Sequence, residues 1–165
     1  MNIQRIIKHL LMTKWQANKS FSLATLHAIE QEIKSSEAQH SGEIRFVVEA
    51  ALDGAPLFKD QSAQERAMDI FSQLRIWDTE HNNGLLIYLL LADHAVEIVA
   101  DRGIHAKVGT DKWQKICRAM ESDFKQGNFK GGVIIGINSI TQHLAKNFPI
   151  APNDTNELSN TPVVM

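Results

Sequence analysis

The chain contains an unbroken apolar run, Leu85–Leu91, followed after a four-residue gap by a second, mostly apolar segment, Val96–Ala100, which Glu97 interrupts. In the first run, side chains on both faces of a β-strand would be apolar, which is typical of a strand covered on both sides. The gap allows only a tight turn, and strands joined so tightly must be antiparallel, because a parallel return needs a long crossover. The sequence therefore predicts a central β-hairpin in a sheet with helices on both faces.

A strand and a capped helix precede this hairpin. Residues 44–50 read as a strand, and a helix from Ser62 to about Leu74 begins with a capping box. In that motif Ser62 and Glu65 exchange hydrogen bonds between their side chains and backbone amides. A strand, a helix and a strand in this order form a βαβ unit, which is expected to be parallel and right-handed.

Four further helices are predicted from apolar residues at helical spacing. Two cover residues 2–16 and 22–36, and two follow the hairpin. Of the two helices after the hairpin, the first is expected to be capped by Thr110, and the second is expected to end before Pro149. The complete order predicts an α/β fold, a small three-layer α/β/α sandwich with a mixed sheet.

Composition excludes several classes of protein. The 165 residues are the length of one domain, and 17 basic against 19 acidic residues give a net charge of −2, which argues against nucleic-acid binding. The single Cys117 excludes an internal disulfide and suits a reducing compartment. No apolar run approaches the roughly 18 residues of a membrane span, and no signal-peptide cleavage pattern is present, so we expect a cytoplasmic protein that is not transmembrane.

Polar residues cluster around the hairpin. Asp78, Asn82 and Asn83 precede its first strand, Asp101 follows its second, and Glu43 begins the strand of the βαβ unit. The predicted strand directions place all five at one end of the sheet. Carboxylates and amides are the ligands that hard cations such as calcium take. We expect a metal site using Glu43, Asp78 and Asp101, with turn chemistry at Asn82-Asn83-Gly84 and a loop cap at Asp101 as the alternative.

Arg102 adjoins the same group of residues. It could orient an anionic ligand such as phosphate beside a bound cation, with Asn82 and Asn83 as further ligand-binding residues. A surface ion pair with Asp78 or Glu43 is an equal alternative. His81 and His105 flank the group and could act as acid or base, although solvated loop histidines are the simpler interpretation.

No complete catalytic set is visible, so the catalytic residues are unknown. The seven histidines form no His-x-x-x-His pair, which disfavours zinc, and no Gly-x-Ser-x-Gly motif is present. Cys117 lies in the apolar stripe of a helix, which predicts a buried, inert thiol. His40 with Glu37 and Glu43 forms a further, weaker group of acidic partners.

The amino-terminal helix is basic and amphipathic, and the chain has no acidic residue before Glu30. Its segment carries four basic residues, Arg5, Lys8, Lys14 and Lys19. Such a helix can lie on an anionic membrane surface or dock to a protein partner. The favoured alternative is that Trp15 and the aliphatic face of the helix pack onto the domain.

A set of short motifs runs through the centre of the chain. They are Gly42-Glu43-Ile44-Arg45, Phe71-Ser72-Gln73-Leu74, Trp77-Asp78-Thr79, Asn82-Asn83-Gly84, Asp101-Arg102-Gly103-Ile104, Trp113 and Asn128-Phe129-Lys130-Gly131-Gly132. With these motifs the chain resembles the TPM domain family, the group that includes thylakoid acid phosphatase-like proteins, over residues 36–149. It looks like the cytoplasmic, single-domain bacterial branch.

The resemblance implies a Rossmann-like domain, divalent-cation binding (Ca²⁺ or Mg²⁺) and a phosphatase activity proposed for some members. Other relatives act without evident catalysis, so fold follows from the resemblance more firmly than function. We expect amino-terminal helices packed on the domain over residues 1–36, a TPM-like domain over 37–149 and a tail over 150–165. The expected function is cation binding with weak phosphatase activity, and the alternative is a non-enzymatic module that binds a protein or a membrane.

Overall fold

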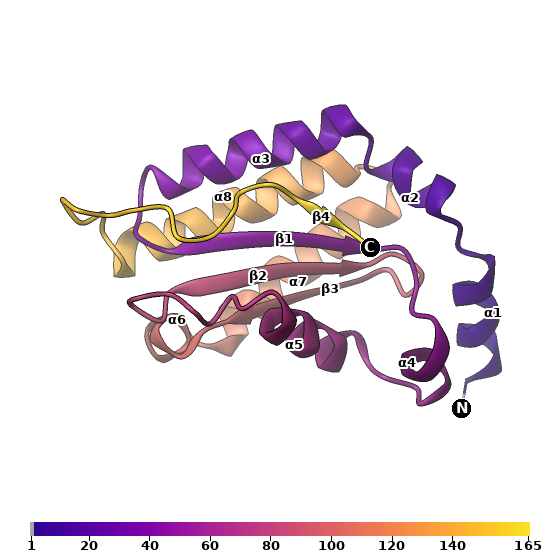
Figure 1. Cartoon of the computed structure of the whole chain (residues 1–165). Coiled ribbons are helices and arrows are strands. Elements are labelled where there is room, and N and C mark those ends of the chain that lie inside the picture. Colours follow the sequence, from indigo (N-terminus) through magenta and orange to yellow (C-terminus); the bar gives the residue numbers. More distant parts are fainter. Residues whose placement is uncertain (1) are drawn as a thin grey trace.

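A four-stranded mixed sheet in the order β3-β2-β1-β4 forms the centre of the molecule (Figure 1). The computed structural model describes residues 2–165. The strands are β1 (Glu43–Glu49), β2 (Gly84–Leu90), β3 (Ala95–Ala100) and β4 (Val163–Val164). β1 runs parallel to β2 and to β4, whereas β2 and β3 form an antiparallel hairpin. The predicted central hairpin and parallel βαβ pairing are confirmed.

Helices cover both faces of this sheet. They are α1 (Ile3–Leu11), α2 (Lys14–Ser20), α3 (Leu23–Glu37), α4 (Gly54–Phe58), α5 (Ala63–Gln73), α6 (Arg102–Val108), α7 (Thr110–Lys125) and α8 (Phe129–Asn147). α3, α7 and α8 pack on one face, and α5 packs on the other. The three-layer α/β/α architecture is therefore confirmed.

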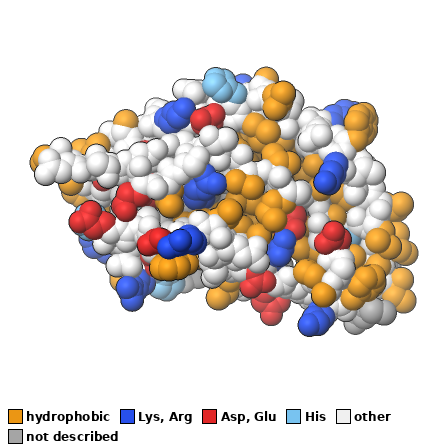
Figure 2. Space-filling model, viewed as in Figure 1, with side chains coloured by type: hydrophobic (Ala, Val, Ile, Leu, Met, Phe, Trp, Pro, Cys, Tyr) orange, Lys and Arg blue, Asp and Glu red, His pale blue; other side chains and the backbone are white. Residues whose placement is uncertain are grey.

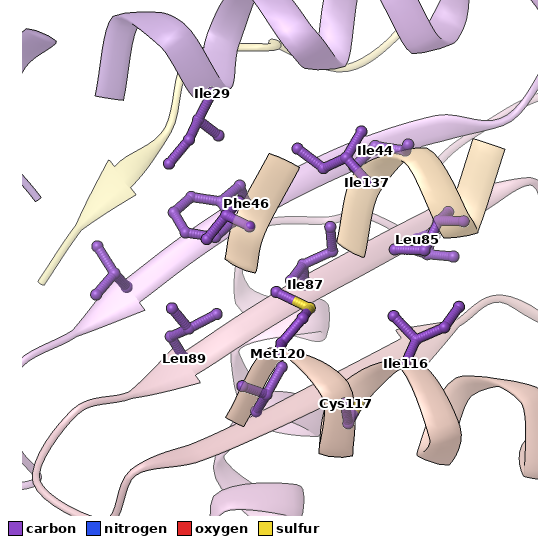
Figure 3. Packing of buried hydrophobic residues seen from close by; sticks show 14 of the residues in the cluster. Ile29, Ile44, Phe46, Leu85, Ile87, Leu89, Ile116, Cys117, Met120 and Ile137 are labelled. Carbon is purple, nitrogen blue, oxygen red and sulfur yellow. The ribbon is translucent and has the colours of Figure 1, made fainter. Parts of the chain in front are cut away.

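β2 is buried along its whole length, as its sequence predicts. Leu85, Ile87 and Leu89 point into the core beneath α3, α7 and α8, where Met120 and Ile137 also lie (Figure 3). The alternate residues of the strand belong to a second core that faces α5. Each full burial of a large aliphatic side chain contributes about 1.5–3 kcal/mol before entropy is counted, so β2 is the main link between the two cores.

Local signals set several helix boundaries. The capping box of α5 is present, with Glu65 N donating to Ser62 Oγ over 3.1 Å and Ser62 N donating to Glu65 Oε2 over 2.8 Å. Thr110, however, is the first residue of α7 and not its cap. Gly109 occupies the cap position at a φ of 84° and supplies no side-chain hydrogen bond.

The amino-terminal region differs from the prediction in two ways. The helix expected over residues 2–16 is two helices, because Thr13 caps α2 and interrupts the helical path after Leu11. The aliphatic face of α1, expected to pack onto the domain, is exposed: Leu10 and Leu11 keep more than two thirds of their surface accessible. That expectation was wrong for these residues because Arg5 and His9 lie on the face that contacts the domain, where half-buried Ile6 packs against the second core.

Three elements were not anticipated from sequence. α4 forms in the expected loop after β1, α6 follows β3 directly, and β4 forms in the carboxy-terminal tail. All three are short, and each depends on neighbours elsewhere in the fold. Among residues 2–165, no helix is both long and apolar enough to cross a membrane.

Candidate functional site

Strand directions bring the predicted site residues to one end of the sheet, which we call the polar end: residues 41–43, 78–83 and 101–102. Glu43 is paired with Gly84, the first residue of β2. Asp101 follows β3, and its amide donates to the carbonyl of Gly84 over 2.9 Å. Glu43, Asn83 and Asp101 therefore lie around the start of β2, as predicted.

Close backbone packing holds the polar end together. Gly103 N donates to the carbonyl of Asn82 over 3.1 Å, and Arg102 Nε donates to Asn82 Oδ1 over 3.2 Å. A Cβ on Gly103 would lie 2.5 Å from that carbonyl oxygen, and a Cβ on Gly84 would overlap the carbonyl of Ile76. Only glycine fits at these two positions, so the turn and the start of β2 are held in contact.

Asn83 and Asp101 each leave one oxygen without a partner. Asn83 Nδ2 donates to the carbonyl of Ser41, and Asp101 Oδ1 accepts from the amide of Arg102 over 2.7 Å, which caps α6. Asn83 Oδ1 and Asp101 Oδ2 are buried and accept no hydrogen bond from any part of the chain that the structure describes. Buried oxygens of this kind are uncommon in folded proteins.

The other two predicted metal ligands point elsewhere. Asp78 is exposed and pairs with Arg75 across 2.7 Å. Glu43 turns toward the tail, where its Oε2 accepts from Leu158 N over 3.0 Å, and burial raises the pKa of its carboxyl group. Within residues 2–165, no three His, Cys, Asp or Glu side chains gather closely enough to hold a metal.

Glu43 instead belongs to a small acidic pocket beneath the tail. The pocket has a volume of about 120 Å³ and is lined in part by Glu37, His40, Glu43 and Asp154. Burial raises the pKa of Glu37 to about 7, and the negative charges of Glu43 and Asp154 add to this effect. The structure thus brings together the group of His40, Glu37 and Glu43 noted in the sequence.

His40 is a structural residue of this pocket. Its Nδ1 accepts from the amide of Gly42 over 3.1 Å, and its Nε2 lies 2.9 Å from Ser36 Oγ. Burial lowers the pKa of His40 to about 4, so the ring is neutral near pH 7. A neutral ring suits this position because its Nδ1 has to accept a hydrogen bond.

The remaining candidates form no catalytic set. His81 and His105 are exposed, as expected, although His105 lies in α6 and not in a loop. Arg102 is exposed and makes its side-chain hydrogen bond to Asn82, and not the ion pair with Asp78 or Glu43 that was the alternative to anion binding. Cys117 is buried, as predicted, and burial raises its pKa to about 12, which disfavours the reactive thiolate.

Sequence reasoning missed two groups of polar residues at the opposite end of the sheet. Arg66 holds buried Glu49 through two hydrogen bonds of 2.8 and 2.9 Å, and Tyr88 donates to the same carboxylate over 2.6 Å. Separately, Asp93 in the hairpin turn binds Arg5 and His9 of α1. Arg5 and Asp93 are 88 residues apart, so no local pattern could have linked them.

Comparisons with known proteins agree with this architecture. The family model of the TPM domain matches residues 16–143. The NMR structure of the BA42 protein from the psychrophilic bacterium Bizionia argentinensis is similar, with a TM-score of 0.75 and 35% sequence identity over 87% of this chain and 94% of that one.

A second solved structure shares the fold. It is the amino-terminal domain of a protein from P. gingivalis, with a TM-score of 0.62 and 20% identity over 77% of this chain and 78% of that one. No curated protein matches the chain. The match to the family model spans most of the sequence, and the motifs around Gly84 and Gly103 are those that build the polar end. The chain therefore belongs to the TPM domain family.

Proposed function

We propose that the protein binds a divalent cation, Ca²⁺ or Mg²⁺, at the polar end of the sheet. The observation that supports this most is the pair of buried oxygens, Asn83 Oδ1 and Asp101 Oδ2, to which residues 2–165 donate no hydrogen bond. Amide and carboxylate oxygens are suitable ligands for hard cations. Both residues adjoin Gly84, one through the chain and one through the hydrogen bond to its carbonyl.

The proposed affinity is weak. Asp78 is paired with Arg75, and one oxygen of Glu43 is engaged by Leu158. With few protein ligands, a bound cation would keep several waters, as Mg²⁺ commonly does, and sites of low ligand charge bind Ca²⁺ at roughly millimolar concentration. The proposal therefore concerns a site that fills only at high cation concentration.

A weak phosphomonoesterase activity is a further part of this proposal. The exposed guanidinium of Arg102 uses its Nε–H on Asn82, and its remaining N–H groups can bind a phosphate oxygen beside the cation. Hydrolysis of p-nitrophenyl phosphate with added Mg²⁺ or Ca²⁺ should fall in Arg102→Gln. No residue is assigned as the nucleophile, and absence of hydrolysis would refute the activity without refuting cation binding.

Amide NMR during a titration with CaCl₂ or MgCl₂ tests the cation site directly. We expect shifts at Asn83, Gly84 and Gly103 at millimolar cation, and loss of these shifts in Asp101→Asn. Asp78→Asn is the matched control, because it removes a carboxylate of the same region that is already paired with Arg75. Shifts that are absent, or that persist in Asp101→Asn, would contradict the proposal.

We also propose a second function, as an interaction module that uses the amino-terminal helices. It is favoured by the exposed aliphatic face of α1, because contiguous exposed apolar surface is typical of sites that contact a partner. The predicted cytoplasmic location remains a proposal of the same kind, supported by the single unpaired cysteine.

A further inference from the structure

α1 is bound to the domain through a partly buried polar anchor. Arg5 donates from Nε and Nη2 to Asp93 over 2.8–3.2 Å and from Nη1 to Asp60 over 2.9 Å. His9 is fully buried at its side chain, with its Nε2 2.9 Å from Asp93 Oδ1. The amide of Leu52 donates to His9 Nδ1 over 2.9 Å. Because Nδ1 accepts, the neutral ring carries its proton on Nε2 and donates it to Asp93.

This anchor determines which face of α1 meets solvent. Arg5 and His9 occupy the inner face, so the opposite stripe, spaced at i, i+4, i+7 and i+8, points outward. Its members are Ile3, Ile7, Leu10 and Leu11, which are 51–69% exposed. We call these four residues the apolar stripe. Hydrophobic side chains are gathered at this end of the molecule in Figure 2.

Further apolar residues continue beyond the stripe. Trp15 of α2 is 69% exposed, and Leu23 at the start of α3 is 86% exposed. Beside Trp15, a hollow of about 670 Å³ lies between α2 and the start of α8, and its lining includes Lys19, Phe129 and Lys130. The exposed surface is thus apolar along α1 and becomes basic toward the hollow.

The segment from residue 2 to residue 29 carries charge of one sign. Arg5, Lys8, Lys14 and Lys19 are its basic residues, and the first acidic residue of the sequence is Glu30. Since Arg5 is neutralised by Asp93, the three lysines provide the charge that faces solvent. An amphipathic helix with aliphatic residues, a nearby tryptophan and lysines is suited to the interface of an anionic bilayer.

We propose that α1 and α2 dock on an anionic lipid membrane, with the apolar stripe entering the interface and the lysines contacting lipid phosphates. This inference rests on the proposed interaction function and names its partner. A second copy of the chain fits less well, because a symmetric contact through the stripe would bring the lysines of both copies together. The polar anchor keeps the stripe exposed, so no unfolding is needed before the helix meets the membrane.

Vesicle co-sedimentation of the full chain tests the proposal. It should be run in EDTA, so that the result is independent of cation binding at the polar end. We expect binding to vesicles of phosphatidylglycerol and phosphatidylcholine to be at least tenfold tighter than to phosphatidylcholine alone. Blue-shifted tryptophan emission should accompany binding and should be lost in Trp15→Phe.

Two variants separate apolar from electrostatic contributions. Ile7→Gln/Leu10→Gln should weaken vesicle binding at least tenfold, and Lys8→Gln/Lys14→Gln should reduce the preference for anionic lipid. The matched control is Met68→Gln/Ile135→Gln, which removes similar exposed apolar surface from α5 and α8. The control should bind as tightly as the unmodified chain.

The outcomes distinguish the lipid partner from the broader interaction function. Absence of vesicle binding, or equal binding by Ile7→Gln/Leu10→Gln, would overturn the lipid proposal. If sedimentation velocity then shows a dimer that this variant dissociates, the stripe is an interface between copies of the chain. If the variant changes neither vesicle binding nor oligomeric state, both the lipid proposal and the interaction function fail.

Discussion

The two ends of the sheet are stabilised by different kinds of interaction. At the polar end, short turns lie so close together that glycine is required, and most hydrogen bonds involve a backbone group. At the opposite end, charged side chains from distant segments pair with one another in largely buried groups around Glu49 and Asp93. Backbone fit therefore stabilises one end, and charge pairing stabilises the other.

This difference is reflected in the groups that each end leaves without a partner within residues 2–165. The polar end places side-chain oxygens of Asn83 and Asp101 around a fixed backbone. The opposite end uses its charges internally and leaves aliphatic residues of α1 outside. The polarity of a residue does not by itself determine whether the residue is buried or exposed. A buried charge that is paired and hydrogen-bonded is compatible with folding, and so is an exposed leucine.

The largest predicted effect is at the buried ion pair. Glu49→Ala leaves the Arg66 guanidinium and the Tyr88 hydroxyl without their acceptor, and removing one partner of a buried pair costs about 3–5 kcal/mol. Urea denaturation should show this loss. Glu80→Ala, at an exposed position, should change the free energy of unfolding by less than about 0.5 kcal/mol. Equal stability of the two variants would contradict the importance of charge pairing at this end.

A smaller loss is expected from crowding the polar end. In Gly84→Ala the added Cβ meets the carbonyl of Ile76, and forcing a group into a packed site costs about 1–3 kcal/mol. Gly127→Ala is the comparison, because its positive φ of 78° brings backbone strain but its Cβ would have open space. Thermal unfolding should rank Gly84→Ala as the less stable. The reverse ranking would refute the backbone-fit interpretation.

In the acidic pocket, Glu37 and His40 should make the free energy of unfolding depend on pH in opposite directions. Burial raises the pKa of Glu37 from 4.5 to about 7, so its contribution to stability is complete below pH 4.5 and is lost as pH rises through 7. Burial lowers the pKa of His40 from 6.5 to about 4, so its contribution is complete above pH 6.5 and is lost as pH falls through 4.

Glu37→Gln isolates the effect of the histidine. Between pH 4.5 and 7, the free energy of unfolding of the variant should rise more steeply with pH than that of the unmodified chain, by about 2–3 kcal/mol across the interval. Chemical denaturation at half-unit pH steps measures this slope. Parallel curves would show that Glu37 titrates normally in the folded protein.

The smallest predicted effect is at Asp78. It forms an exposed pair with Arg75 three residues away, and such pairs contribute roughly 0–1 kcal/mol. Asp78→Asn should therefore lower the free energy of unfolding by less than about 0.5 kcal/mol. A larger loss, seen by urea denaturation at low salt, would mean that Asp78 supports the polar end after all.

Strong local patterns predicted the fold. The apolar run Leu85–Leu91 identified the doubly covered strand, and Ser62 with Glu65 identified the start of α5. Strand direction then predicted that Glu43, Asn83 and Asp101 meet at one end. These predictions succeeded because each depends on periodicity, on a four-residue motif or on the length of a turn.

Side-chain direction and long-range pairing could not be predicted in this way. The side chain of Glu43 accepts a hydrogen bond from Leu158, and the side chain of Asp93 accepts one from Arg5. Both contacts join segments that are far apart in the sequence. The amphipathic pattern of α1 correctly indicated a helix, but the same pattern fits an inward or an outward apolar face. The polar anchor, which decides between them, is visible only in the folded chain.

β4 has a consequence for how the sheet is assembled. Val163 and Val164 pair with Val47 and Val48, and Met165 N donates to the carbonyl of Val48 over 2.9 Å. During synthesis, more than a hundred residues must follow β1 before this partner exists. Until then β1 has unpaired backbone groups along one side, the kind of open strand that recruits other chains. β4, which is synthesised more than a hundred residues after β1, thus covers backbone groups of β1 that would otherwise stay open to other chains.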